Sequence, residues 1–226
     1  MAECRIHPEV PMPDPAVLTR LAALPTPALS DSMGRLRGAR GLLPLTGKGR
    51  LVGPALTVQT RPGDNLVVHK AADLARPGEV LVVDAGGNPD RAIVGDLLCR
   101  YAASRGVTGM VVDGAVRDVA EVAELGMPLF ARAVSHLGPY KNGPGEIRGQ
   151  VSVGGMPVGN GDLIVADENG VLAIPRPRVA EVIAAAEALL ERERVIVEAI
   201  DADAWDRSWV DNALDITWCA QEQESR

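Results

Sequence analysis

Two short apolar runs constrain the fold of this chain more than any other feature of its sequence. Residues 80–84 read VLVVD and residues 109–113 read GMVVD, and glycine-bearing turns bound both runs. A run of this length between turns is typical of a strand that is buried on both faces of a parallel sheet. Each run leads through a loop into a helix, so the sequence predicts two strand–loop–helix units in a layered α/β fold.

The composition agrees with a globular domain that has an aliphatic core. The chain has 226 residues, of which 46% are hydrophobic and only 3% are aromatic. Val, Ile, Leu and Ala must therefore fill the interior. We expect a single domain over residues 1–226, with an extended arm at residues 1–13 and a helical tail at residues 201–226.

Charge and cysteine usage exclude several classes of function. A net charge of −7 argues against a nucleic-acid surface, which needs clustered Lys and Arg, but it permits a basic protein partner. No apolar run approaches the ~20 residues of a membrane span, and the first residues lack the apolar core of a signal peptide. The 3 cysteines are far apart and form neither a disulfide framework nor a zinc motif. We expect a cytoplasmic protein with no nucleic-acid or membrane partner.

The remaining elements follow from apolar periodicity and turn residues. We expect helices at residues 15–24, 26–34, 65–72, 97–105, 119–125 and 178–200, and strands at 51–60, 128–134, 151–153, 163–166 and 171–174. Residues 135–149 carry glycine and proline and are expected to form a loop. The last long helix has an apolar face made of Val179, Val182, Ile183, Ala186 and Leu190. Trp205, Trp209, Leu214 and Trp218 indicate a final amphipathic face.

The chemistry of the sequence lies at the two strand–loop–helix junctions. If the two strands are parallel neighbours, their loops open at the same sheet edge, where open α/β sheets place ligands. Asp96 would then converge with the pair Arg117-Asp118, from which twenty residues separate it in sequence. Two carboxylates suit a hard ion such as Mg²⁺ or Mn²⁺. Arg117 would add a fixed cation, and the first-turn amides of Leu97 and Leu98 would favour a carboxylate.

Each of these residues also has a structural interpretation. Asp96 and Asp118 both precede helices, where an Asp is most often an N-cap, and Arg117 alone would be a surface ion pair. His69 on its expected helix is interpreted as structural. No G-x-G-x-x-G, Walker loop, HExxH or Ser/His/Asp order is visible. Only the joint spacing of the three charged residues favours a metal and substrate site.

Several segments resemble one known family across most of the chain. They are TPALSD at 26–31, DNL at 64–66, PGEVLVVDAGG at 77–87, VVDGAVRD at 111–118 and GDLIVADENGVLAIP at 161–175. The family contains 4-hydroxy-4-methyl-2-oxoglutarate/4-carboxy-4-hydroxy-2-oxoadipate aldolases and the RraA-type regulators of ribonuclease E. The pattern Asp-x20-Arg-Asp is typical of the aldolase branch, and here it is intact. The resemblance implies a three-layer β/β/α swivelling-type fold, assembled as a homotrimer or hexamer.

The resemblance also implies roles for individual residues. Asp118 would bind a divalent metal, Mg²⁺ with Mn²⁺ as the alternative, and Asp96 would hold it through metal-bound water. Arg117 would bind substrate oxygens. The amides of Leu97 and Leu98, after Gly95-Asp96, would bind the pyruvyl carboxylate, and Asn65 would lie near the site. A glutamate from the neighbouring subunit's C-terminal helix would complete it, with Glu193 as the candidate and Glu191 as the alternative.

The implied activity is a metal-dependent retro-aldol cleavage of a 2-oxo acid to pyruvate, with oxaloacetate decarboxylation as a side activity. This route needs no Schiff base, and Lys48, Lys70 and Lys141 lie outside the motif. Two alternatives stay open at this point. The chain could be a non-catalytic regulator of a ribonuclease, or a related enzyme that acts on another 2-oxo acid.

Overall fold

The computed structural model describes residues 1–35, 38–46 and 50–217. The chain divides into two compact units, Met1–Glu187 and Ala188–Arg226. Within those described ranges, no helix combines the length and the apolar character that a bilayer crossing requires.

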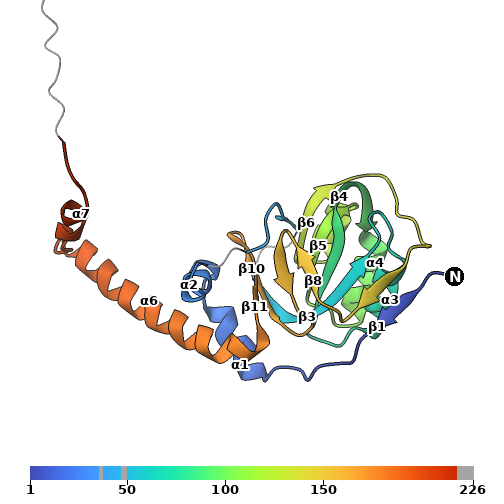
Figure 1. Ribbon diagram of the computed structural model, residues 1–226, viewed down its shortest axis with the longest axis horizontal. Coiled ribbons are helices and arrows are strands. Elements are labelled where there is room, and N and C mark those ends of the chain that lie inside the picture. The colour runs from blue at the N-terminus through green and yellow to red at the C-terminus, as the bar shows by residue number, and fades with distance from the viewer. Residues whose placement is uncertain (36–37, 47–49, 218–226) are drawn as a thin grey trace, which may run out of the picture. The chain divides into compact units, whose positions relative to one another are not determined.

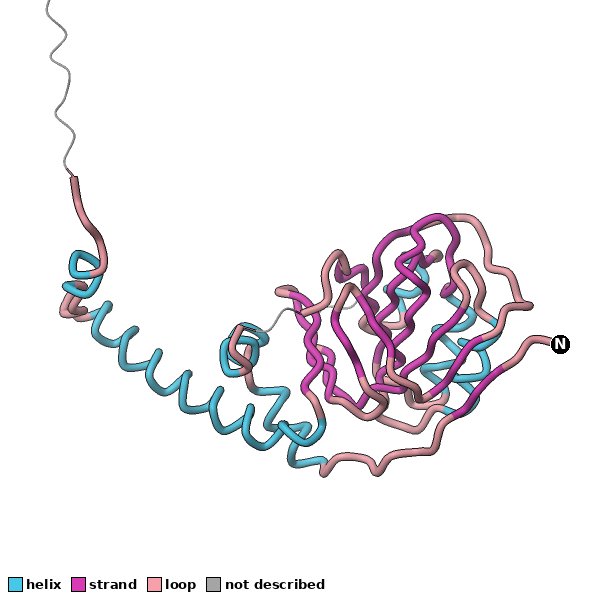
Figure 2. Tube along the Cα trace, in the orientation of Figure 1, coloured by secondary structure: helices cyan, strands magenta, loops and turns pink. Residues whose placement is uncertain are grey.

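Nine of the described strands form one sheet in the first unit (Figures 1 and 2). Its centre is parallel and consists of β3 (Leu51–Thr60), β4 (Val80–Val94), β5 (Gly109–Val116) and β6 (Leu129–Val134). The outer strands are β1 (Cys4–Ile6), β7 (Gly145–Ile147) and β2 (Leu43–Thr46), while β10 (Leu163–Asp167) and β11 (Gly170–Ile174) join through β3. The two predicted strands are thus parallel neighbours.

The central sheet is covered on both faces, which explains why its strands read as continuous apolar runs. Leu81 and Val83 pack into a core with the helices α3 (Leu66–Leu74), α4 (Asp96–Ser104) and α5 (Val119–Glu124). Val80 and Val82 point to the other face, into a core with β8 (Val151–Val153), β9 (Met156–Val158), β10 and β11. Burial of each such side chain stabilises the folded state by about 1.5–3 kcal/mol relative to leaving the side chain exposed. The predicted three-layer β/β/α fold is confirmed.

The largest differences from the expectation concern one strand end and one expected loop. The strand expected at residues 80–84 continues to Val94, because register shifts after Asp84 and Asn88 let it carry extra residues while it still pairs with β5. Gly86 and Gly87, with φ of 67° and 68°, lie inside this irregular segment. The loop expected at residues 135–149 contains β7, which is too short to give a periodic signal.

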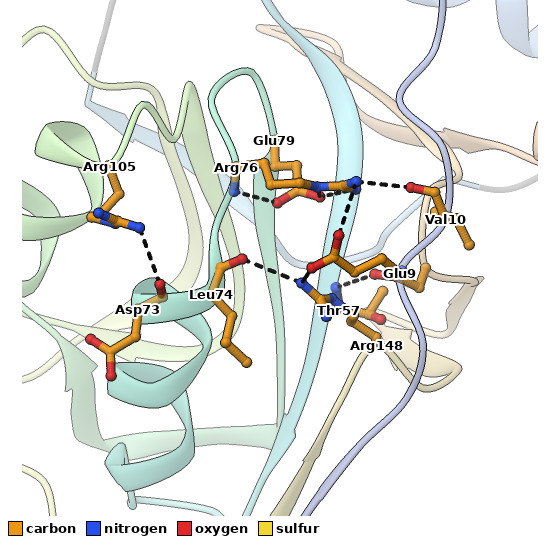
Figure 3. Close-up of polar contacts among 10 residues, drawn as sticks. Glu9, Val10, Thr57, Asp73, Leu74, Arg76, Glu79, Arg105 and Arg148 are labelled. Carbon is orange, nitrogen blue, oxygen red and sulfur yellow. Dashed lines mark hydrogen bonds and ion pairs between the residues drawn. The ribbon is translucent and has the colours of Figure 1, made fainter.

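The N-terminal arm carries the strand β1 and is held in place by ion pairs. Its strand β1 pairs in parallel with β7. Beyond this strand, Glu9 accepts a bond from Nη2 of Arg148 at 2.7 Å and lies 3.6 Å from Arg76 (Figure 3). The Arg148 side chain is only 6% exposed, and Arg76 in turn pairs with the buried Glu79 at 2.6 Å. The arm therefore neutralises a buried guanidinium, which would be costly without a partner.

The helices near the ends follow the predicted patterns in part. Asp14 caps α1 (Pro15–Ala23) through the amide of Ala16 at 2.8 Å, and α2 (Thr26–Ser32) follows. The long helix α6 (Val179–Asp201) buries the expected residues Val179, Val182, Ile183 and Ala186. In the second unit, α7 (Ser208–Asn212) carries Trp209, whereas Trp218 lies outside the described residues.

Candidate active site

Two strand-to-helix junctions meet at one edge of the sheet. In the β4–β5 ladder, Val94 pairs with Val116, so the two strands end side by side. The first strand leads through Gly95 into α4, and the second leads through Arg117 and Asp118 into α5. The amide of Arg117 donates to the carbonyl of Val94 at 2.9 Å and ties the junctions together. This is the convergence that the sequence predicts.

A cavity of about 620 Å³ opens at this edge. It brings together every predicted site residue of the first unit: Asn65, Gly95, Asp96, Leu97, Leu98, Arg117 and Asp118. The remaining candidate, Glu193, belongs to the second unit, and so does its alternative Glu191. Both glutamates stay predictions.

Asp118 has an unusual backbone and an unusual partner. Its φ of 56° and ψ of 39° are left-handed, which is uncommon outside glycine and is often found at functional sites. It occupies the N-cap position of α5 but makes no capping bond there, so the N-cap interpretation is wrong for this residue. Its Oδ2 instead accepts the amide hydrogen of Asp96 at 3.1 Å. The carboxylate is therefore directed across to the other junction.

The close approach of the two junctions requires a glycine. A Cβ atom added to Gly95 would lie 2.5 Å from Oδ2 of Asp118 and 3.1 Å from Cγ of Arg117. Gly95 has extended backbone angles, so its role is to leave space and not to adopt a special conformation. It is also the N-cap of α4, which means that the N-cap interpretation of Asp96 is wrong as well.

The carboxylate of Asp96 lies in the first turn of α4 and is paired with Arg100, whose Nε donates at 2.7 and 2.9 Å to its two oxygens. Both acids of the site affect the pKa of the buried Cys99 thiol. Burial raises its pKa to about 12, and the charges of Asp96 and Asp118 add to the increase. The two carboxylates thus act on one small region of the protein, and Cys99 is an inert thiol.

Arg117 lines the cavity and lies close both to Asp118 and to the loop at Gly138. Its Nε is 3.5 Å from Oδ2 of Asp118, and 42% of its side chain is exposed. A Cβ atom on Gly138 would lie 3.0 Å from Nη1 of Arg117, so the loop also approaches this guanidinium closely. The guanidinium is paired with a carboxylate yet reachable from solvent, which suits recognition of an anionic or oxygen-rich ligand.

Lys141 is a site residue that sequence reasoning missed. Its Nζ donates to Oδ1 of Asn65 at 2.9 Å and lies 3.0 Å from Nε2 of His69. Both residues line the cavity, so His69 has a place in the site beyond a structural one. Burial lowers the pKa of His69 and the nearby ammonium of Lys141 lowers it further, against the opposing effect of Asp73. Lys141 lies in a loop that has no periodic pattern. The scarcity of lysines in the sequence was the only feature that could have pointed to Lys141 as a site residue.

The donor set of the cavity fits a hydrated divalent ion. Asp96 and Asp118 offer hard oxygen ligands, and Mg²⁺ bound by one or two carboxylates keeps several waters. Among residues 1–35, 38–46 and 50–217, no group of three or more His, Cys, Asp or Glu could hold a metal ion. A metal here would therefore rest on two carboxylates, and it would compete with Arg100 for Asp96.

Comparison with known proteins identifies the family. The family model described as RraA-like (Aldolase/RraA) matches residues 26–173. A relative from Halalkalibacterium halodurans, provisionally named 4-hydroxy-4-methyl-2-oxoglutarate aldolase, is 38% identical over 200 residues, which cover 88% of this chain and 91% of that protein. The 4-hydroxy-4-methyl-2-oxoglutarate aldolase of Thermus thermophilus is 37% identical over 131 residues, which cover 58% of this chain and 79% of that protein.

A solved structure shares the fold. The RNA-processing inhibitor RraA from Thermus thermophilus superposes with a TM-score of 0.62 and 34% identity, over 67% of this chain and 92% of that chain. The family model covers more than half of the sequence, and it includes both junctions of the cavity. The chain therefore belongs to the RraA-like family.

Proposed function

We propose that this chain is a divalent-metal-dependent aldolase that cleaves 4-hydroxy-4-methyl-2-oxoglutarate-type 2-oxo acids to pyruvate, with oxaloacetate decarboxylation as a side activity. The observation that carries the proposal is the bond from the Asp96 amide to the Asp118 carboxylate, because it joins the two junctions beside Arg117 in one cavity. The cavity is lined by three carboxylates, those of Asp96, Asp118 and Glu121, and by two cations, Arg117 and Lys141. This set suits a substrate that has charged ends and reacting oxygens.

Two groups of the cavity suit the carboxylates of such a substrate. The amides of Leu97 and Leu98 lie in the first turn of α4, where N–H groups have no carbonyl partner within the helix and the helix dipole is positive. They would bind the carboxylate next to the keto group. The ammonium of Lys141, held beside Asn65 and His69, would bind the second carboxylate.

The cleavage moves one proton and one electron pair. The C4 hydroxyl loses its proton to a water or a base, the C3–C4 bond breaks, and C4 becomes the carbonyl carbon of the second product. The electron pair of the broken bond remains on the C2–C3 unit as the pyruvate enolate, which takes up a proton at C3. Arg117 would bind the C4 oxygen and stabilise the charge that develops there. Loss of CO₂ from oxaloacetate leaves the same enolate, which accounts for the expected side activity.

Asp118 and Asp96 are the residues that would hold the divalent ion, with Mg²⁺ as the first candidate and Mn²⁺ as the alternative. When bound, such an ion polarises the 2-keto oxygen and so favours negative charge on the C2–C3 unit. Because Gly95 has no side chain, the Asp118 carboxylate has room to lie beside the amide of Asp96.

We also propose that the chain forms a homotrimer or hexamer, in which Glu193 reaches a neighbouring site. The second unit exposes large apolar side chains, including Val195, Val197, Trp209 and Leu214, and such surfaces mark protein interfaces. Glu191 is paired with Arg194, whereas Glu193 has no ion pair among the described residues. Light scattering after size exclusion tests the assembly. Glu193→Gln should lower activity and Glu191→Gln should not, and the opposite order would reassign the glutamate.

The deciding experiment is a coupled assay for pyruvate from 4-hydroxy-4-methyl-2-oxoglutarate and from oxaloacetate, with Mg²⁺ or with EDTA. We expect turnover that requires the ion, and its loss in Asp118→Asn. Binding of Mn²⁺ alone, followed by calorimetry, should weaken in the same variant. Asp31→Asn serves as a control, because Asp31 is an exposed carboxylate on α2. Activity that survives EDTA or Asp118→Asn would refute the metal assignment.

A second candidate function is inhibition of an RNA-processing enzyme without catalysis. It is favoured by the fold shared with the RraA structure and by the net charge of −7, which suits a basic partner. Failure to turn over either 2-oxo acid, together with inhibition of a purified ribonuclease E, would select this function.

A further inference from the structure

Asp64 is a fully buried carboxylate beside the cavity, and the chemistry proposed above does not use it. Its side chain is 0% exposed. Its Oδ1 accepts the amide hydrogen of Leu66 at 2.9 Å, and its Oδ2 accepts those of Asn142 and Gly143 at 2.9 and 2.7 Å. Arg61 adds a charged donor to Oδ2 at 3.1 Å. Such a carboxylate stays ionised in the interior only because these donors replace water.

The donors belong to two different segments that line the cavity. Leu66 begins α3, the helix that carries His69. Asn142 and Gly143 directly follow Lys141 in the loop that faces this helix. A single carboxylate therefore joins the start of the helix to the loop and sets the separation between Lys141 and His69, whose nitrogens lie 3.0 Å apart.

The backbone on either side of this carboxylate completes the connection. The amide of Asn65 donates to the carbonyl of Tyr140 at 3.1 Å, and the amide of Tyr140 donates to the carbonyl of Gly63 at 2.9 Å. The ring of Tyr140 packs under the guanidinium of Arg91, with 4.3 Å between the carbon Cζ and the ring centroid. The loop is thus held immediately before Lys141 as well as after it.

The loop at Gly143 packs so closely against the Asp64 carboxylate that a side chain at position 143 has no space. A Cβ atom on Gly143 would lie 2.8 Å from Cγ and 3.0 Å from Oδ2 of Asp64. Because real Cβ atoms do not approach so closely, any larger residue at position 143 must increase the separation between the loop and Asp64. Gly143 itself does not line the cavity, so its substitution tests the position of the loop without adding atoms to the site.

We propose that Asp64 is a positioning residue that fixes the ammonium of Lys141 against Asn65 and His69, where it binds the second carboxylate of the substrate. The substrate part of this inference rests on the proposed aldolase function, whereas the positioning part does not. Asp64 touches neither substrate nor reacting atoms and acts through the loop.

The kinetic test compares Asp64→Asn and Gly143→Ala with Lys141→Met. An asparagine at position 64 must direct its NH₂ group toward either Leu66 or the loop amides, so it loses donors on one side. We expect KM for 4-hydroxy-4-methyl-2-oxoglutarate to rise about tenfold in each variant while kcat changes less than about threefold, as for lost ground-state binding. In the Lys141→Met background, Asp64→Asn should add little, because coupled residues are not additive.

The matched control is Asp167→Asn. Asp167 is also a buried carboxylate that gathers donors from two segments, Thr26 and Asn169, but it does not line the cavity. This variant should lose stability and keep the wild-type KM. An equal rise of KM in Asp167→Asn would mean that loss of stability alone explains the effect.

A spectroscopic test separates this inference from the proposed function. The charged groups that face His69 are Lys141 and Asp73, so displacement of Lys141 should raise the pKa of His69, followed by NMR of the histidine rings. We expect the rise in Lys141→Met, in Asp64→Asn and in Gly143→Ala, but not in Asp167→Asn. If the wild type lacks aldolase activity and the rise occurs, only the substrate assignment fails. If Gly143→Ala and Asp64→Asn fold and leave the pKa of His69 unchanged, the positioning role is refuted.

Discussion

Substitution of Gly95 by alanine tests the geometry of the candidate site with the addition of one carbon atom. Gly95 has φ of −150° and ψ of −175°, which alanine adopts without strain. The added Cβ would lie 2.5 Å from Oδ2 of Asp118, whereas an ordinary carbon–oxygen contact is about 3.3 Å or longer. The carboxylate must therefore move by about 0.8 Å or more.

This displacement has unequal effects on activity and on stability. The bond from the Asp96 amide to Asp118, now 3.1 Å, would lengthen beyond hydrogen-bond range. A misplacement of about 1 Å in a catalytic group costs on the order of 100-fold in rate. Asp118 is 39% exposed and can turn toward water, so the loss of stability should be small, about 1 kcal/mol, or about 2–4 °C in Tm.

The assay pairs kinetics with ion binding. Pyruvate release, calorimetric binding of Mn²⁺ and thermal unfolding are measured for Gly95→Ala and for Gly159→Ala. Gly159 is a suitable control because a Cβ there would also meet a carboxylate oxygen, Oδ2 of Asp162 at 3.2 Å, outside the cavity. We expect the control to keep wild-type activity and ion affinity.

Two results would refute this reasoning. If Gly95→Ala keeps activity and Mn²⁺ affinity within about twofold of wild type, the position of Asp118 does not matter for the proposed chemistry. If activity falls only in proportion to unfolding, the effect is one of stability and not of site geometry.

Other predictions follow from buried charges and thiols. A thiol reagent should modify the exposed Cys4 in the native protein and reach the buried Cys99 only after unfolding, which peptide mass spectrometry would show. Glu9→Gln should lower the free energy of unfolding by about 1–3 kcal/mol, because Arg148 loses its carboxylate partner, and an unchanged calorimetric Tm would contradict this. Burial raises the pKa of Asp167, but its hydrogen bonds outweigh burial and the net pKa is lowered. Its carboxylate therefore contributes stability above the unfolded pKa and loses it as pH falls through the folded value, so Asp167→Asn should flatten the loss of stability below about pH 4 in acid titrations.

The parts of the fold that were predictable have local causes. The runs at residues 80–84 and 109–113 are apolar because both faces of their strands are covered, and a parallel pair must then end at one edge. The convergence of Asp96 with Arg117 and Asp118 follows from that topology. The three-layer fold was predicted from the family resemblance, since the pattern of strands and helices alone indicated only a layered α/β domain.

The parts that were not predictable depend on distant contacts. Lys141 enters the site because Asp64, far away in sequence, holds the amides that follow it. The expected capping roles were wrong because Gly95 takes the N-cap position of α4 and the Asp118 carboxylate accepts the Asp96 amide of the other junction. The strand β7 exists only through its pairing with β1 and β3, which no local pattern records.

The arm imposes an order on synthesis of the chain. Glu9 and its partner Arg148 are 139 residues apart. Cys4 of β1 pairs with Gly145, which lies 145 − 4 = 141 residues further on. At a translation rate of about 5–20 residues per second, the arm is synthesised about 7–28 s before its partner residues. The first residues to emerge are thus among the last to dock. A nascent chain that loses its arm to a protease in this interval would fold without β1 and without the carboxylate partner of the Arg148 guanidinium.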